Sequence, residues 1–139
     1  MAAGGGFTFG GGVALLHSEQ IKAFRELLPK DVPIKLETSL NVPFERLLEV
    51  IDVVDEYLID VKTMDSQIYQ SYTGMSNERV LKNLQLLCDN KLQNKCKIRI
   101  PNIPEFTTKE DTERTIDIIR KMGFEDLDVF DYIIREEEE

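Results

Sequence analysis

Apolar and polar residues alternate with a period of two in several short stretches of the chain. This period turns successive side chains to opposite faces and is typical of β-strands. The stretches that show it are Gly6–Phe9, Ile34–Thr38, Tyr57–Val61, Lys97–Ile100 and Leu127–Ile134. The sequence therefore predicts five strands, separated by segments of a different period.

Four longer segments between these strands carry apolar residues three or four positions apart, which is typical of helices packed on one side. Thr107 with Glu110 is a candidate capping box for the last of them, whereas Ser71–Gly74 is rich in turn residues. Pro101 is expected to stop the strand before that helix. The predicted helices are Glu19–Leu28, a segment from Pro43 to about Val54, a segment from Ser76 to Cys88, and one from Thr107 to Met122.

Strands that alternate with helices indicate an α/β fold with a parallel sheet and right-handed crossovers. The chain has 139 residues, too few for an eight-stranded barrel. We therefore predict a single domain, residues 1–139, that forms a partial parallel (β/α) barrel of about five strands and four outer helices. In such a fold the carboxyl ends of the strands share one rim, and ligands bind there.

Charged side chains occur inside the predicted strands. In the strand that begins at Tyr57, Asp60 and Lys62 point to one face with Leu58, while the other face carries Tyr57, Ile59 and Val61. The neighbouring strands repeat this with Lys35 and Glu37, and with Lys97 and Arg99. Strands of a parallel sheet are normally apolar on both faces, so these charges indicate a polar cavity. Mutual ion pairing inside the barrel is the structural alternative.

Composition restricts the kinds of partner. The formal net charge of -9 would repel nucleic acid and anionic lipid. The sequence shows neither a stretch long and apolar enough to cross a bilayer nor the pattern of a signal peptide, so a cytoplasmic location is expected. Cys88 and Cys96 match no zinc or iron–sulfur spacing, and reduced structural thiols are predicted.

Several strings in the chain resemble those of glycyl-radical-enzyme activating enzymes similar to the pyruvate formate-lyase activating enzyme, members of the radical S-adenosylmethionine superfamily. Each string alone is weak, but they occur in that family's order and approximate spacing. They are GGGFTFGGG at 4–12, ETS at 37–39, IDVKTMD at 59–65, TGMSNERVL at 73–81 and IRIPNIP at 98–104. The resemblance covers nearly the whole chain.

The resemblance implies S-adenosylmethionine as cofactor, a 4Fe-4S cluster in the full-length family, and a glycyl radical enzyme as the protein partner. Glycine allows close approach of a ligand to the backbone, and a zwitterionic amino-acid group needs partners of both signs. On this resemblance, Glu37, Thr38 and Asp60 form an oxygen-rich corner that could hold a small cation beside the cofactor's carboxylate. The residues that it assigns to the cofactor are Gly11, Gly12, Glu37, Thr38, Asp60, Lys62 and Arg99.

The sequence departs from the family in the segment that would carry the cluster. The upstream strand and its Cys-x3-Cys-x2-Cys loop have no counterpart here, so we expect a truncated barrel that does not ligate the cluster. Val13 replaces a glutamate that would pair with the cofactor's ammonium group, Glu37 replaces an aspartate, and Glu105 stands where glycine is common. The expected late histidine is absent from the last predicted strand.

Three functions are compatible with these features. The first is the core of an activating enzyme that would bind S-adenosylmethionine and, as this chain alone, would be inactive. The second is a cluster-free interaction or regulatory module derived from the same fold. The third is a phosphate-binding βα domain that uses Gly10–Gly12 and the next helix, although Glu37 and Asp60 would oppose a phosphate.

Overall fold

The computed structural model describes residues 7–10 and 14–131 of the chain. Strands and helices alternate along this part, as the apolar periodicity predicts. The strands are β1 (Phe7–Phe9), β2 (Ile34–Thr38), β3 (Glu56–Asp60), β4 (Cys96–Asn102) and β5 (Asp126–Asp131). The α-helices are α1 (Ser18–Leu27), α2 (Phe44–Val50), α3 (Ser66–Thr73), α4 (Glu78–Asp89) and α5 (Lys109–Lys121), with short 3-10 helices η1 (Ala14–His17) and η2 (Gln93–Lys95).

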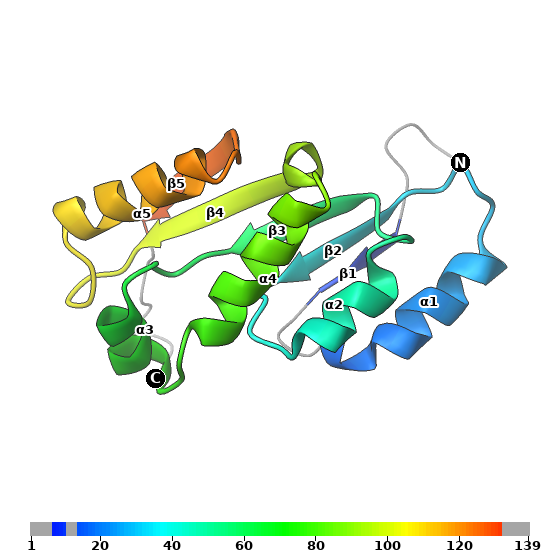
Figure 1. Cartoon of the computed structure of the whole chain (residues 1–139), viewed down its shortest axis with the longest axis horizontal. Helices are drawn as coiled ribbons and strands as arrows, with labels where there is room; N and C mark the ends of the chain where they lie inside the picture. The colour runs from blue at the N-terminus through cyan, green and yellow to red at the C-terminus, as the bar shows by residue number, and fades with distance from the viewer. Residues whose placement is uncertain (1–6, 11–13, 132–139) are drawn as a thin grey trace, which may run out of the picture.

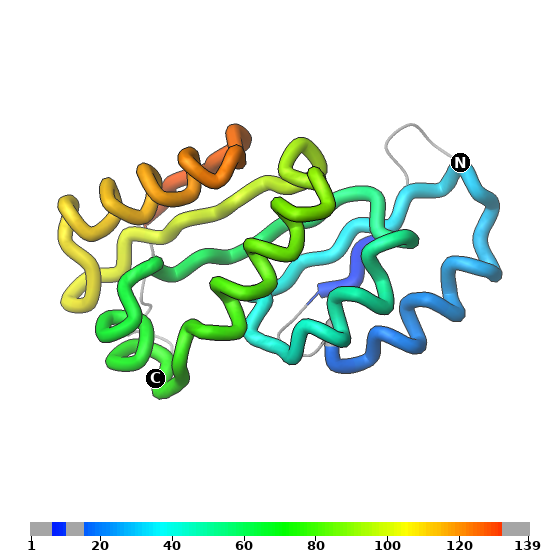
Figure 2. The backbone as a smooth tube through the Cα atoms, viewed as in Figure 1, coloured from blue at the N-terminus to red at the C-terminus, as the bar shows by residue number. Residues whose placement is uncertain are grey.

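The described strands form one sheet in the order β1-β2-β3-β4-β5, and every neighbouring pair is parallel. Right-handed crossovers that always step in the same direction place their helices on the same face of a sheet. Figure 1 shows this arrangement, with α2 and α4 in front of the strands. In Figure 2 the chain advances from β1 at one edge of the sheet to β5 at the other. The predicted α/β partial barrel is confirmed.

The core lies between the sheet and these helices. In β3, Tyr57 and Ile59 are fully buried on the helix side, and Ile34, Leu36 and Ile98 continue this apolar layer across the neighbouring strands. Burial of each such side chain contributes about 1.5–3 kcal/mol to the free energy of unfolding. The period-two alternation in the sequence therefore identified the inner face correctly, and the other face of the sheet holds the charged residues.

Helix α3 corrects the prediction of a turn at Ser71–Gly74. Asp65 caps its start, because one carboxylate oxygen accepts hydrogen bonds from Gln67 N and Ile68 N, each at 2.9 Å. Gly74 ends the helix with φ 78°, a left-handed conformation that favours glycine. Figure 1 shows α3 beyond the arrowheads of β3 and β4, beside the carboxyl end of the sheet.

Two boundaries near the β4–α5 connection also differ from the prediction. The capping box is formed by Thr108 and Asp111, one position after the predicted pair Thr107 and Glu110. Strand β4 continues through Pro101 to Asn102. Arg99 makes the last β3–β4 pair, so the missing N–H of Pro101 falls where β3 has already ended. The proline therefore interrupts no ladder hydrogen bond to β3.

Candidate functional site

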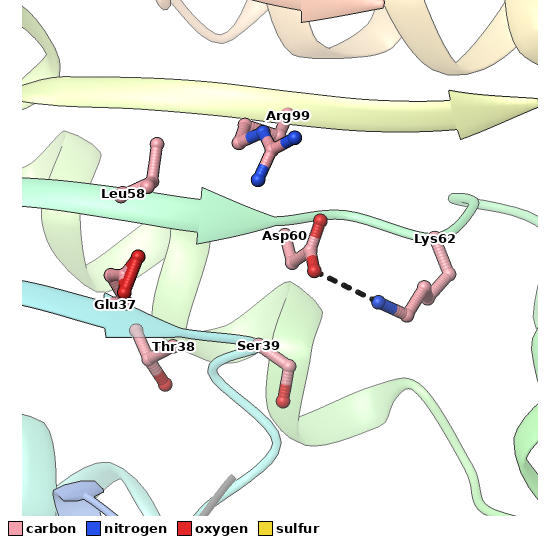
Figure 3. A pocket seen from close by; sticks show the side chains of 7 residues that line it. All are labelled: Glu37, Thr38, Ser39, Leu58, Asp60, Lys62 and Arg99. Carbon is pink, nitrogen blue, oxygen red and sulfur yellow. Dashed lines mark hydrogen bonds and ion pairs between the residues drawn. The ribbon is translucent and has the colours of Figure 1, made fainter. Parts of the chain in front are cut away.

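A cavity of about 430 Å³ opens on the charged face of the sheet, at the carboxyl ends of three adjacent strands. β2, β3 and β4 and the segments that follow β2 and β3 supply its lining (Figure 3). The lining residues are Glu37, Thr38, Ser39, Leu58, Asp60, Lys62 and Arg99. Two carboxylates and two cations therefore face one space, where their formal charges cancel.

Asp60 and Lys62 form an ion pair within this cavity. Lys62 Nζ donates to Asp60 Oδ2 at 3.0 Å, and the lysine side chain is 24% exposed. The second oxygen, Asp60 Oδ1, is buried and has no hydrogen-bond partner among the described residues. A buried carboxylate oxygen without a partner is costly. This oxygen is therefore an unsatisfied acceptor on a residue that lines the cavity.

Glu37 lies near the end of β2, next to Gly10, which follows β1. A β-carbon added at Gly10 would come within 2.9 Å of Glu37 Oε2, closer than real contacts allow. Because glycine at this position has no β-carbon, the Glu37 carboxylate can occupy the space beside it. Within the described part of the chain, no hydrogen bond or ion pair engages the Glu37 carboxylate.

Arg99 reaches the cavity from β4, where it is paired in register with Asp60 of β3. Its Nε lies 3.6 Å from Asp128 Oδ2, and its guanidinium carbon lies 4.4 Å from the ring centroid of Phe130. Both partners are on β5, so the arginine is oriented by the strand beside it. In Figure 3 its guanidinium group lies on the side of β4 that faces Asp60.

The turn after β2 orients the remaining polar groups. Thr38 Oγ1 accepts a hydrogen bond from Leu40 N at 3.0 Å, so its own O–H remains able to donate. Ser39 lines the cavity beside it. Leu40 has φ 62°, a left-handed conformation that is uncommon for a branched residue.

Five of the seven residues predicted for the cofactor thus line one cavity. Gly11 and Gly12 lie outside the described residues. The prediction omitted Ser39 and Leu58, although Leu58 shares the strand face of Asp60 and Ser39 follows Thr38 directly. These two relations in the sequence could have identified them.

Ion pairing, the structural alternative, applies to part of this face. Besides the Asp60–Lys62 pair, Lys35 Nζ lies 3.4 Å from Glu56 Oε2 at the opposite end of the sheet. Pairing does not account for Glu37 or for the second oxygen of Asp60. The cavity therefore retains acceptor groups beyond those that the ion pairs use.

The two cysteines lie apart from this cavity. Cys88 Sγ contacts Met122 O at 3.4 Å, and Cys96 Sγ contacts Leu92 O at 3.3 Å. Burial raises the pKa of both thiols, that of Cys96 to about 12, which opposes the thiolate form that binds iron. Over residues 7–10 and 14–131, no cluster of histidine, cysteine and carboxylate side chains could hold a metal ion. These residues do not fit a 4Fe-4S cluster.

The fold and the charged rim agree with a match to a protein family. The family model described as the Radical SAM superfamily matches residues 2–119, which is most of the chain. The chain therefore belongs to the Radical SAM superfamily. In this name, SAM stands for S-adenosylmethionine. Membership implies S-adenosylmethionine and a 4Fe-4S cluster as the cofactors of the family.

Within that superfamily, the chain is similar to activating enzymes of glycyl radical enzymes. It is 39% identical over 102 residues to the (2S)-3-sulfopropanediol dehydratase activating enzyme of Klebsiella oxytoca, covering 73% of this chain and 32% of the relative. It is 33% identical over 118 residues to the pyruvate formate-lyase 2-activating enzyme of Escherichia coli (strain K12), covering 84% and 40%. The chain thus spans about a third to two fifths of these relatives. The predicted family is confirmed.

A solved structure supports the fold independently. The chain superimposes with a TM-score of 0.62 on a domain of pyruvate-formate lyase-activating enzyme from Bacteroides vulgatus ATCC 8482. The alignment covers 90% of this chain and 98% of that domain, at 22% identity. At that identity the likeness supports the fold alone.

Among the described helices, none has the length and apolar character needed to cross a membrane.

Proposed function

We propose that this chain is the S-adenosylmethionine-binding part of a glycyl-radical-enzyme activating enzyme. One observation carries the proposal: charged groups of both signs from three adjacent strands meet in a single cavity at the carboxyl edge of the sheet. This edge is where parallel α/β folds bind their ligands. The family match and the activating enzymes among the relatives support the same assignment.

The charges suit the amino-acid end of the cofactor, which carries an ammonium group and a carboxylate. Asp60 Oδ1, which lacks a partner among the described residues, and the Glu37 carboxylate would accept hydrogen bonds from the ammonium group. Lys62 and Arg99 would attract the carboxylate. The small cation expected beside Glu37, Thr38 and Asp60 is not part of this proposal, because no group of histidine, cysteine and carboxylate side chains in the described residues could hold a metal ion.

The glycine segment contributes backbone groups to the proposed site. Gly11 and Gly12 follow Gly10, whose lack of a β-carbon leaves room for Glu37. Their backbone would contact the methionyl part of the cofactor. Because Val13 has no charge, it would not pair with the ammonium group, and we expect weaker binding than in a relative with glutamate there.

S-adenosylmethionine, held by Glu37, Asp60, Lys62 and Arg99, would supply the radical chemistry by which an activating enzyme acts on a glycine of its partner enzyme. The residues of this chain orient the cofactor at the rim and set the charges around it. They provide no ligand set for the cluster in the described part, so we propose that this chain alone binds the cofactor without cleaving it. The glycyl radical enzyme would approach the same open rim.

Isothermal titration with S-adenosylmethionine tests the proposal, with ATP as a comparison ligand for the phosphate-binding alternative. We expect binding of S-adenosylmethionine and no binding of ATP. Arg99→Ala should weaken that binding at least tenfold. Lys97→Ala is the matched control, because it removes the same charge from the same strand and Lys97 does not line the cavity. Its affinity should stay at the wild-type value.

The alternatives make different predictions for this titration. Absence of binding at millimolar S-adenosylmethionine would reject a working cofactor site and favour the cluster-free interaction module. Binding of ATP in preference to S-adenosylmethionine would favour the phosphate-binding domain. Equal weakening by Arg99→Ala and Lys97→Ala would show that binding depends on overall charge and not on the cavity.

A further inference from the structure

A buried asparagine on α4 holds the turn that forms one wall of the cavity. Asn83 is fully buried, and its side-chain amide donates two hydrogen bonds to backbone carbonyl groups of the β2–α2 connection. The acceptors are Leu40 O at 2.8 Å and Val42 O at 2.9 Å. A single side chain distant in sequence therefore ties down both ends of a three-residue segment.

This segment needs such support because of its backbone conformation. Leu40 has φ 62°, which is unfavourable for a residue with a β-carbon unless its surroundings impose it. Its side chain is fully buried, and that of Val42 is 4% exposed. The two amide hydrogen bonds and the burial of these side chains together fix a turn that the local sequence would not favour.

The turn connects Asn83 to the cavity through a continuous chain of contacts. Leu40, whose carbonyl accepts from Asn83, donates its own N–H to Thr38 Oγ1 at 3.0 Å. Thr38 and Ser39 then line the cavity. A change at Asn83 would therefore reach the cavity through Leu40.

The amide is also an unusual choice for the inner face of α4. Its neighbours on that face, Val80, Leu84 and Leu87, are fully buried and apolar. Its oxygen, Oδ1, is buried and has no hydrogen-bond partner among the described residues. Burying this polar group is unfavourable unless its donors are satisfied. A leucine would pack better on this face of the helix. The role of Asn83 is therefore to donate its two hydrogen bonds to the turn.

We infer that Asn83 is a positioning residue for the cofactor cavity: it sets the conformation of the β2–α2 turn and thereby the orientation of Thr38 and Ser39. This inference rests on the proposed function, because the ligand whose contacts are positioned is S-adenosylmethionine. Asn83 itself does not line the cavity and would not touch the ligand.

The test compares Asn83→Leu with Leu87→Ala, a control in the same helix at an apolar side chain that donates no hydrogen bond to the turn. Two quantities are measured for each variant, well below its melting temperature. They are the hydrogen-exchange rate of the Leu40 amide and the dissociation constant for S-adenosylmethionine. For Asn83→Leu we expect Leu40 exchange and the dissociation constant each to rise at least tenfold. For Leu87→Ala we expect a lower melting temperature with both quantities near wild type.

Asn83→Ser serves if Asn83→Leu does not fold, because a serine hydroxyl cannot reach both carbonyl groups. The inference would be overturned if the Leu40 amide of the variant exchanged its hydrogen as slowly as in the wild type. It would also be overturned if this amide exchanged faster but the variant bound S-adenosylmethionine with wild-type affinity. If the wild-type chain binds no S-adenosylmethionine, the proposed function fails. The hydrogen-exchange rate of the Leu40 amide then decides whether Asn83 holds the turn. An unchanged rate in the variant would show that it does not.

Discussion

The substitution Asp60→Asn tests whether the Asp60 carboxylate contacts the ligand directly or acts only through its negative charge. The substitution keeps the shape of the side chain and removes its negative charge. In the folded chain it weakens the ion pair with Lys62, whose Nζ lies 3.0 Å from Asp60 Oδ2. The carboxylate side chain is 39% exposed, so the loss of the pair should lower the free energy of unfolding by only about 0–1 kcal/mol.

The expected effect on binding is larger. Under the proposed function, the Asp60 carboxylate, which lines the cavity, would accept a charge-assisted hydrogen bond from the ammonium group of the ligand. Losing such a bond costs about 1.5–3 kcal/mol. This corresponds to a rise in the dissociation constant for S-adenosylmethionine of roughly 10- to 150-fold. Isothermal titration measures it, with urea unfolding as the measure of stability.

Glu56→Gln is the matched control. It removes the same charge from the same strand and breaks a comparable ion pair, in which Lys35 Nζ lies 3.4 Å from Glu56 Oε2. Glu56 lies at the opposite end of β3 from Asp60, so its removal should change the dissociation constant by no more than about twofold at a Debye length of about 8 Å. Equal losses in the two variants, or wild-type affinity in Asp60→Asn, would refute the assignment of Asp60.

Three further predictions concern stability. Burial raises the pKa of the Cys96 thiol from 9.0 to about 12, so the folded chain keeps a proton that the unfolded chain releases. The contribution of this thiol to the free energy of unfolding is present below pH 9 and is lost as the pH rises toward 12. Between pH 9 and 10, the free energy of unfolding of the wild type should therefore fall by up to about 1 kcal/mol more than that of Cys96→Ala. Parallel pH profiles of the two proteins would contradict this. Glu105 has φ 72°, so Glu105→Gly should raise the free energy of unfolding by about 1 kcal/mol in urea titration, a fall being the contrary result. Thr108→Ala removes the N-cap of α5 and should lower that free energy by about 1 kcal/mol, whereas no change would mean that water replaces the cap.

The sheet and the faces of its strands could be predicted because burial imposes a strong pattern. Tyr57 and Ile59 alternate with Leu58 and Asp60, and a one-residue shift would expose the apolar pair. Helix α3 escaped prediction because Ser66–Thr73 is mostly polar and only Tyr69 is buried, so it lacks an apolar stripe. Its start and end signals, Asp65 and Gly74, were present in the sequence.

The candidate site was only partly predictable. Asp60 and Arg99 stood out because charges are unusual inside strands of a parallel sheet. Asn83 did not stand out, because an isolated amide within an apolar helical stripe gives no sign of which backbone groups it will meet. Its acceptors, Leu40 O and Val42 O, lie more than forty residues earlier in the chain and become neighbours only in the fold.

The order of the strands affects how the chain folds. Each strand after β1 pairs with the strand that precedes it in the sequence, so each new pairing closes only the loop of one intervening segment. Such short closures cost little entropy and favour rapid folding relative to sheets with distant pairings. A ribosome releases β1 first and β5 last, and each new strand can therefore dock on a partner that is already in place. The chain can thus assemble its sheet in the order in which it is synthesised.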